Sequence, residues 1–320
     1  MSVSPEHYAD FLQRIGHTVR QAGHSWWFDC ASRVYSNFPF HHDVDVTSLD
    51  VADVLKSDGL ILRTSCPQHQ GVSSFRMICD DKNYDFPALR SRTRTQVRRG
   101  LEACSVRQID FEELQRCYLP LQRATHERQG RRKEANDQQT WGRFFEAAKT
   151  TVGAETWAAF VNNEMAAYLV SFQIEETANL CIVRSDTRLL KSYPNNALLY
   201  RFLYETLRRP DIRQVSYGLQ SVEPGGEELD RFKTGMGFRQ EPCGQRIVFS
   251  GRISPLLKRP VLKLLQPCVR TLLKNESGRK IDGLLTWYQQ QPDLGTATRN
   301  PNQLDSGNPA NLVAAESTQA

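Results

Sequence analysis

Two acidic residues stand where apolar runs end, and both are candidates for acid–base chemistry. Asp186 follows the run 179–184, and Glu223 lies in the loop sequence QSVEPGG after the run 214–217. Strand ends that face a cleft are where α/β proteins build their sites, and a carboxylate there can take a proton from an attacking nucleophile. We therefore predict catalytic roles for Asp186 and Glu223. The alternative for each is a solvated loop acid or a helix cap.

An arginine cluster is the second chemical feature. Arg90, Arg94 and Arg98 recur every four residues and so share one face of a helix expected at 87–103. Five of the ten residues 90–99 are arginines and none is acidic. Guanidinium groups bind phosphate or carboxylate oxygens in pairs, so this face predicts binding of an anionic substrate. The alternative is a solvated face that pairs with acids such as Glu112 or Glu113.

Histidines and cysteines predict no metal. His41 and His42 precede Asp43 and Asp45, but neighbouring side chains diverge on a strand or a helix, which disfavours one shared ion. The eight cysteines are scattered and form no CxxC pair, which is typical of reduced, buried thiols. Cys181 lies inside an expected strand without a basic partner nearby, so we interpret it as core filler.

The composition is that of a folded protein. The chain has 320 residues, 39% of them hydrophobic, and a net charge of +5. It contains no apolar run long enough to span a membrane and no secretory signal at its start, so we expect a cytoplasmic protein. Residues 290–320 are rich in small polar residues and predict a disordered tail. Residues 253–289 alternate apolar and basic groups and predict an amphipathic helical extension.

The elements that position these residues are strands and helices in alternation. Hydrophobic periodicity predicts a helix at 5–22, two strands within 59–80, and helices at 87–103, 110–126 and 136–149. The second half predicts strands at 157–161, 165–174, 179–184, 214–217 and 245–249, with helices after the sequence PNN at 194–196 and at 229–236. Strands interrupted by helices indicate a mixed α/β layer fold.

Three stretches carry a resemblance to a known family. LRSRTRTQVRRGLEACSVRQI, YPNNALLYRFLYETLRRPDIRQVSYGLQS and LDRFKTGMGFRQEP are similar to segments of the GNAT superfamily of N-acyltransferases, in its FemAB-related branch, and the match covers residues 60–250. The resemblance implies an α/β, GNAT-like mixed sheet flanked by helices, with a related or degenerate N-terminal half. It implies an N-terminal half at 1–135 and a GNAT-like acyltransferase domain at 136–252.

The resemblance also implies a binding site for the acyl donor. In the superfamily the donor lies between two diverging strands, here 179–184 and 214–217, and its pyrophosphate binds backbone N–H groups at the next helix start. This chain departs from the pattern, because its turn contains no glycine that would let the backbone approach a phosphate closely. The residues implied for donor binding are Ser185, Lys191, Asn195, Asn196, Ala197 and Lys233. The residues implied for the acceptor are Tyr217 and the three arginines, Arg90, Arg94 and Arg98.

The predicted function is transfer of an acyl group from an acyl-CoA co-substrate to the amine of a small anionic metabolite or amino sugar. The attack is direct, without a covalent enzyme intermediate. One alternative is a non-catalytic binding module that keeps the fold. Another is a FemAB-like transferase that takes its acyl group from aminoacyl-tRNA, which the arginine face would bind.

Overall fold

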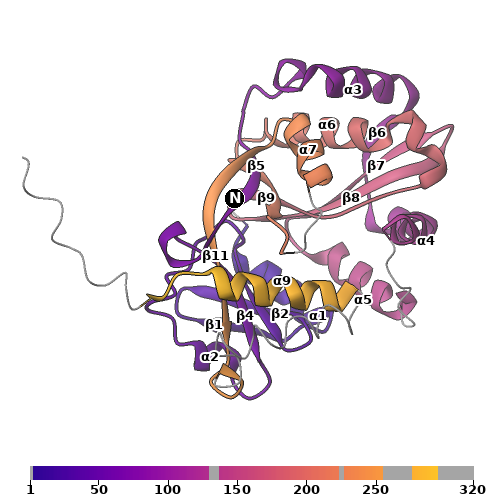
Figure 1. Cartoon of the computed structure of the whole chain (residues 1–320). Coiled ribbons are helices and arrows are strands. Elements are labelled where there is room, and N and C mark those ends of the chain that lie inside the picture. Colours follow the sequence, from indigo (N-terminus) through magenta and orange to yellow (C-terminus); the bar gives the residue numbers. More distant parts are fainter. Residues whose placement is uncertain (1–2, 130–136, 223–226, 255–275, 295–320) are drawn as a thin grey trace, which may run out of the picture.

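One continuous sheet organises the chain. The computed structural model describes residues 3–129, 137–222, 227–254 and 276–294. Within these ranges the sheet has eleven strands in the order β1-β2-β3-β4-β11-β5-β10-β9-β8-β7-β6, with helices on both faces (Figure 1). The strands are β1 Val19–Ala22, β2 Ser25–Ala31, β3 Val34–Phe38, β4 Ile61–Cys66, β5 Val72–Cys79, β6 Ser105–Ile109, β7 Ala154–Val161, β8 Glu164–Ile174, β9 Thr177–Ser185, β10 Gln214–Leu219 and β11 Arg239–Phe249. The helices are α1 Pro5–Arg14, α2 Val51–Leu55, η1 Gln68–Gln70, η2 Phe86–Ala88, α3 Ser91–Ala103, α4 Phe111–Arg128, α5 Asp137–Thr150, η3 Thr187–Ser192, α6 Pro194–Thr206, α7 Glu227–Gly235 and α9 Glu276–Gln290.

The same strand pattern occurs twice. β1, β2 and β3 form an antiparallel meander, and β3 then pairs with β4 in parallel. β7, β8 and β9 form a second antiparallel meander, and β9 pairs with β10 in parallel. In each case a helical segment connects the two parallel strands, as such a connection requires. The repeat confirms the expected mixed sheet with an N-terminal half that is related to the second half.

Two strands join the halves of the sheet. β11, near the end of the described chain, lies between β4 and β5, and β5 also pairs with β10. β6 precedes residue 135 in sequence yet pairs with β7 of the second half. The sheet therefore runs without interruption across the predicted boundary between residues 135 and 136.

Each face of the second half has its own helices and core. Leu169 of β8 packs in the cluster formed with α3 and α6, where Val97 and Phe202 are buried. Its neighbour Tyr168 packs in the opposite cluster with α1, α4 and α5, where Phe11 and Phe145 are buried. Successive strand residues point to opposite faces, so β8 is buried on both.

The N-terminal segment differs from the sequence prediction. The helix expected at 5–22 ends at Arg14, and residues 19–22 form β1 instead. Gly16 has φ +100°, a left-handed conformation that ends the helix and that glycine adopts at little cost. No helix in the described ranges is both long enough and apolar enough to cross a bilayer. The predicted disordered tail lies almost wholly outside the described residues, as does 255–275 of the predicted extension.

Candidate functional site

The strands β9 and β10 separate along their length. Their parallel pairing joins Gln214, Val215 and Ser216 to Thr177, Ala178 and Asn179, and ends there. β9 continues to Ser185 and β10 continues to Leu219. Beyond Asn179, the edge of β9 that faces β10 therefore has backbone N–H and C=O groups without a strand partner. Such groups can bind an extended ligand that enters between the strands.

Both strands are irregular at the point where they part. In β9, Ile182 pairs with Val170 and Leu180 pairs with Ser171, so Cys181 is an extra residue that forms a β-bulge. In β10, the pairing with β5 is irregular between Ser216 and Leu219, and Gly218 has φ +85°. A bulge bends its strand and increases the local twist, which explains why the two strands diverge.

Two cavities of about 640 Å³ each meet at this gap. Both are lined by Cys181, by Tyr217 and by Leu229 of α7. The α6-side cavity is further lined by residues of α4, β9 and α6, and the α9-side cavity by residues of β10, α7 and α9. A ligand placed in the gap would therefore be accessible from both sides.

The α9-side cavity combines one buried cation with several acids. Lys233 is 6% exposed, and its Nζ lies 3.2 Å from Asp230 Oδ1 and 4.9 Å from the centre of the Tyr217 ring. Burial lowers the pKa of Lys233, partly offset by Asp230. Burial also raises the pKa of Tyr217 to about 12, so its hydroxyl keeps its proton at neutral pH. Glu227 and Asp282 line the same cavity. These acids favour a ligand with a positive charge.

The α6-side cavity is basic. Arg128, Arg184 and Asn195 line it, against one acid, Glu228. Ser185 also lines it, and its Oγ accepts hydrogen bonds from Arg128 Nη2 and Asn195 Nδ2, both at 3.1 Å. The sequence prediction named Ser185 and Asn195 for donor binding, and the structure brings these two together. Arginines of this kind hold an anionic ligand.

Asp186 has a different environment from the one expected of a base. It is 4% exposed and lines neither cavity. Its Oδ1 accepts a hydrogen bond from the backbone N–H of Arg188 at 2.8 Å, which caps η3, and its Oδ2 pairs with the Arg188 guanidinium at 2.6 Å. The hydrogen bonds from Arg188 hold the pKa of Asp186 below its usual range. This contact set is that of the helix cap considered as the alternative. Glu223 lies outside the described residues.

The start of α6 offers few amides to a phosphate. Pro194 has no N–H, and the N–H groups of Asn196 and Ala197 both donate to Tyr193 O at 3.1 Å. α3 packs closely here, since a Cβ on Gly100 would lie 2.8 Å from Tyr193 O. Asn196 and Ala197 are buried and line neither cavity, and Lys191 is exposed away from both.

The arginine face lies on α3 and lines neither cavity. Arg90 and Arg98 are exposed, with Arg98 stacked on the Phe86 ring at 5.3 Å. Arg94 instead donates to the backbone oxygens of Phe86 and Leu89 at 3.1 and 3.2 Å, which gives it a structural role. The acids considered as partners bond elsewhere, Glu113 to Arg107 and Glu112 to Lys149.

Sequence reasoning missed three groups at this site. Arg128 and Asp282 lie at helix positions with nothing in the local pattern to mark them. Cys181 was expected to be buried, but it is exposed to both cavities. Its position follows from the bulge, and a bulge depends on the partner strand's register rather than on the local sequence.

The comparisons with known proteins support the fold. A scan against protein-family models and a search of curated proteins find no match. The crystal structure of FemX is similar over 81% of this chain and 93% of that one, with 12% identity and a TM-score of 0.56. The C-terminal domain (DUF2156) of a putative lysylphosphatidylglycerol synthetase from Agrobacterium fabrum is similar over 82% and 91%, with 11% identity and a TM-score of 0.52. Together with the repeated strand pattern, these similarities confirm that the chain has a GNAT- and FemAB-related fold.

Proposed function

We propose that this protein is an acyltransferase that passes an activated acyl group through the gap between β9 and β10 onto an amine. The observation that carries the proposal is the divergence of these strands after Asn179 and Ser216, with a cavity on each side. The basic α6-side cavity suits an anionic donor. The acidic α9-side cavity suits an amine acceptor with a positive charge. The acceptor thus differs from the anionic metabolite that the arginines predicted from sequence, because those arginines line neither cavity.

The reaction is direct attack of the amine nitrogen on the acyl carbon. A charged acceptor first loses one proton to water, because only the neutral nitrogen has a lone pair with which to attack. The C–N bond then forms and the bond from the acyl carbon to the oxygen or sulfur of the donor breaks. The second proton of the amine passes by way of the Tyr217 hydroxyl to the leaving group. Lys233 stabilises the negative charge that develops on the acyl oxygen, because a buried cation is effective where water is excluded. Tyr217 supplies a proton for the leaving group. Cys181 is exposed to the two cavities but is enclosed by protein atoms on its other sides, and this desolvation raises the pKa of its thiol to about 12, so it carries almost no thiolate to act as a nucleophile.

The start of α6 distinguishes two classes of donor. An acyl-CoA would bring a pyrophosphate to α6, where Asn196 and Ala197 already donate to Tyr193 and α3 packs closely. An aminoacyl-tRNA would instead place its backbone on an extended basic surface. α3 packs across the start of α6 and offers Arg90, Arg92, Arg98 and Arg99, all exposed and without an ion pair among the described residues. These observations favour aminoacyl-tRNA over acyl-CoA as the donor, and we keep both as candidates for the test.

The test compares both donors on the full-length chain. Binding is measured for acetyl-CoA, longer acyl-CoAs and aminoacylated total tRNA, and transfer is measured as single-turnover loss of a labelled acyl group to a panel of di- and polyamines. The variant Cys181→Phe fills the gap and abolishes transfer, whereas Cys181→Ala keeps it. Transfer by Cys181→Phe at the wild-type rate would contradict the proposal.

The donor class is read from a second variant. With tRNA as donor, Arg92→Ala combined with Arg99→Ala weakens binding and reduces its dependence on salt, while acyl-CoA binding is unchanged. The matched control is Arg201→Ala, whose guanidinium pairs with Glu205 on α6. Binding of neither donor at millimolar concentration would instead support a non-catalytic module.

A further inference from the structure

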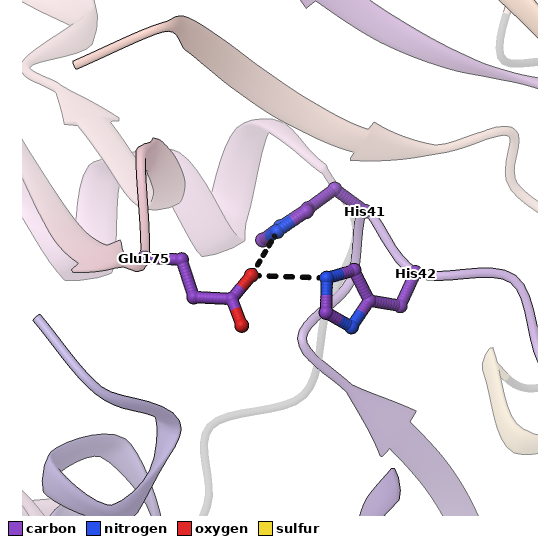
Figure 2. A group of neighbouring side chains, drawn as sticks. All are labelled: His41, His42 and Glu175. Atoms are coloured by element: carbon purple, nitrogen blue, oxygen red, sulfur yellow. Dashed lines mark hydrogen bonds and ion pairs between the residues drawn. The ribbon is translucent and has the colours of Figure 1, made fainter. Parts of the chain in front are cut away.

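A histidine pair and a glutamate converge at the opposite end of β9 and β10. His41 Nε2 lies 2.8 Å from Glu175 Oε2, and His42 Nε2 lies 2.9 Å from the same oxygen (Figure 2). One nitrogen of each histidine and a carboxylate oxygen of Glu175 all lie within 4.8 Å of one another. The three side chains line a cavity of about 700 Å³ that also contains Thr177 and Gln214, the first residues of the two strands. This cluster is separate from the gap where the acyl group is proposed to react.

The backbone brings the two rings together. Neighbouring histidines diverge on a strand or a helix, which is why the sequence predicted no metal here. Residues 40–42 form a turn and a bend after β3, and both rings face Glu175 (Figure 2). The His42 backbone oxygen accepts hydrogen bonds from Ser65 Oγ at 2.8 Å and Asn37 Nδ2 at 3.3 Å, so the turn is fixed in place before any ligand binds.

Glu175 is held in an uncommon conformation. It lies in the two-residue turn between β8 and β9 with φ +55°, a region that glycine and asparagine adopt more readily. Its backbone N–H donates to Val3 O at 2.6 Å. A glycine would fit this turn position more easily but would have no side chain. The glutamate found here instead places a carboxylate beside the two histidines.

Without an ion the cluster leaves hydrogen-bonding capacity unused. Two imidazoles share a single carboxylate oxygen, and His41 Nδ1 is buried without a partner. Asp43 and Asp45, which the sequence placed beside the histidines, are engaged elsewhere, with Arg76 and with Thr47.

We propose that His41, His42 and Glu175 bind one divalent transition-metal ion of the zinc class, with a fourth position open to the cavity. Tetrahedral zinc with bonds of about 2.0–2.1 Å separates its ligand atoms by roughly 3.3 Å. The histidine–carboxylate distances of 2.8 and 2.9 Å would therefore lengthen by a few tenths of an ångström, and the two histidine nitrogens, which lie within 4.8 Å of each other, would adopt a similar separation. The histidines follow β3 of the first half and Glu175 precedes β9 of the second. The ion would therefore connect the two halves and stabilise their junction.

The test uses the untagged full-length chain, stripped with a chelator and titrated with Zn²⁺ by calorimetry and with Co²⁺ by absorbance. We expect one ion per chain, a tetrahedral Co²⁺ spectrum without the near-ultraviolet band of a thiolate ligand, and a rise in Tm on adding Zn²⁺. His42→Gln and Glu175→Gln weaken binding by at least about 100-fold and abolish the rise in Tm.

The matched control is His17→Gln, which removes a histidine–carboxylate pair elsewhere in the first half, His17 Nδ1 to Asp29 Oδ1 at 2.8 Å. This variant binds Zn²⁺ like the wild type. Equal affinity in wild type, His42→Gln and Glu175→Gln would overturn the proposal, as would a Co²⁺ spectrum with thiolate ligands. Circular dichroism of each variant shows whether a loss of binding reflects loss of the fold. Acyl transfer is read in a separate assay, so either proposal can fail without the other.

Discussion

Lys233 is the residue on which the proposed chemistry depends most. It is the buried cation beside Tyr217 in the α9-side cavity, and it forms an ion pair with Asp230. We expect Lys233→Ala to reduce acyl transfer by about 10²–10³-fold, because it removes charge stabilisation of the acyl oxygen. Single-turnover rates measure the loss, and Lys233→Arg restores part of it by keeping the charge.

The control for this variant is Lys149→Ala, whose ammonium pairs with Glu112 and Glu146 far from the gap. It should transfer at the wild-type rate. If Lys233→Ala did the same while remaining folded, Lys233 would have no part in catalysis.

At the residue level the sequence predicts chemistry only where the local pattern fixes the surroundings. The sequence predicts binding roles for both Tyr217 and Lys233, because the family resemblance covers the strand and the helix that carry them. The structure places these two side chains in contact. The three-residue cluster at Glu175 could not be predicted. Its partners are 134 positions apart in the chain, and their approach depends on the register of two halves of the sheet.

At the level of elements, the packing of α3 against α6 rests on Gly100. A Cβ at this position would lie 2.8 Å from Tyr193 O and 3.1 Å from Ala197 Cβ. We expect Gly100→Ala to lower the free energy of unfolding by about 1–3 kcal/mol, as in other overpacked sites. Urea denaturation measures the change.

Gly142 of α5 provides the matched comparison, because a Cβ there meets nothing within 4 Å. Gly142→Ala should raise the free energy of unfolding by about 0.5–1 kcal/mol, the usual gain of alanine over glycine in a helix. A Gly100→Ala protein as stable as Gly142→Ala would show that the two helices do not pack closely.

The secondary structure of the second half could be predicted from the sequence, whereas the first three strands of the first half could not. Residues 154–249 alternate long apolar strands with well-marked helices, and each expected element is found. In the first half, β1, β2 and β3 are short and half-buried, so their periodicity is weak. Their identity depends on pairing with one another and with β4, which a local pattern does not record.

At the level of the whole molecule, the end of the described chain completes the sheet. Beyond Gln245 the β5 side of β11 has no strand partner, and Gln291 takes that place. The Ile247 N–H donates to Gln291 Oε1, and Gln291 Nε2 donates to Ile247 O, both at 3.0 Å. One side chain thus substitutes for a residue of a strand.

Loss of this side chain should therefore be costly. Gln291→Ala leaves a buried N–H and a buried C=O unpaired, and we expect it to lower the free energy of unfolding by about 1–3 kcal/mol. The neighbouring Gln290→Ala, at an exposed position, should change it by less than about 0.5 kcal/mol. Thermal and urea denaturation compare the two. Equal stability would mean that α9 docks on β11 without this contact.

The gap between β9 and β10 has a kinetic consequence. The gap opens into the α6-side and α9-side cavities, which share Cys181, Tyr217 and Leu229. Donor and acceptor can therefore be bound at the same time. Initial velocities measured against both concentrations should then give double-reciprocal lines that intersect, the signature of a sequential order. Parallel lines would instead indicate a ping-pong mechanism, in which the acyl group is first bound covalently to the protein and the donor leaves before the acceptor binds.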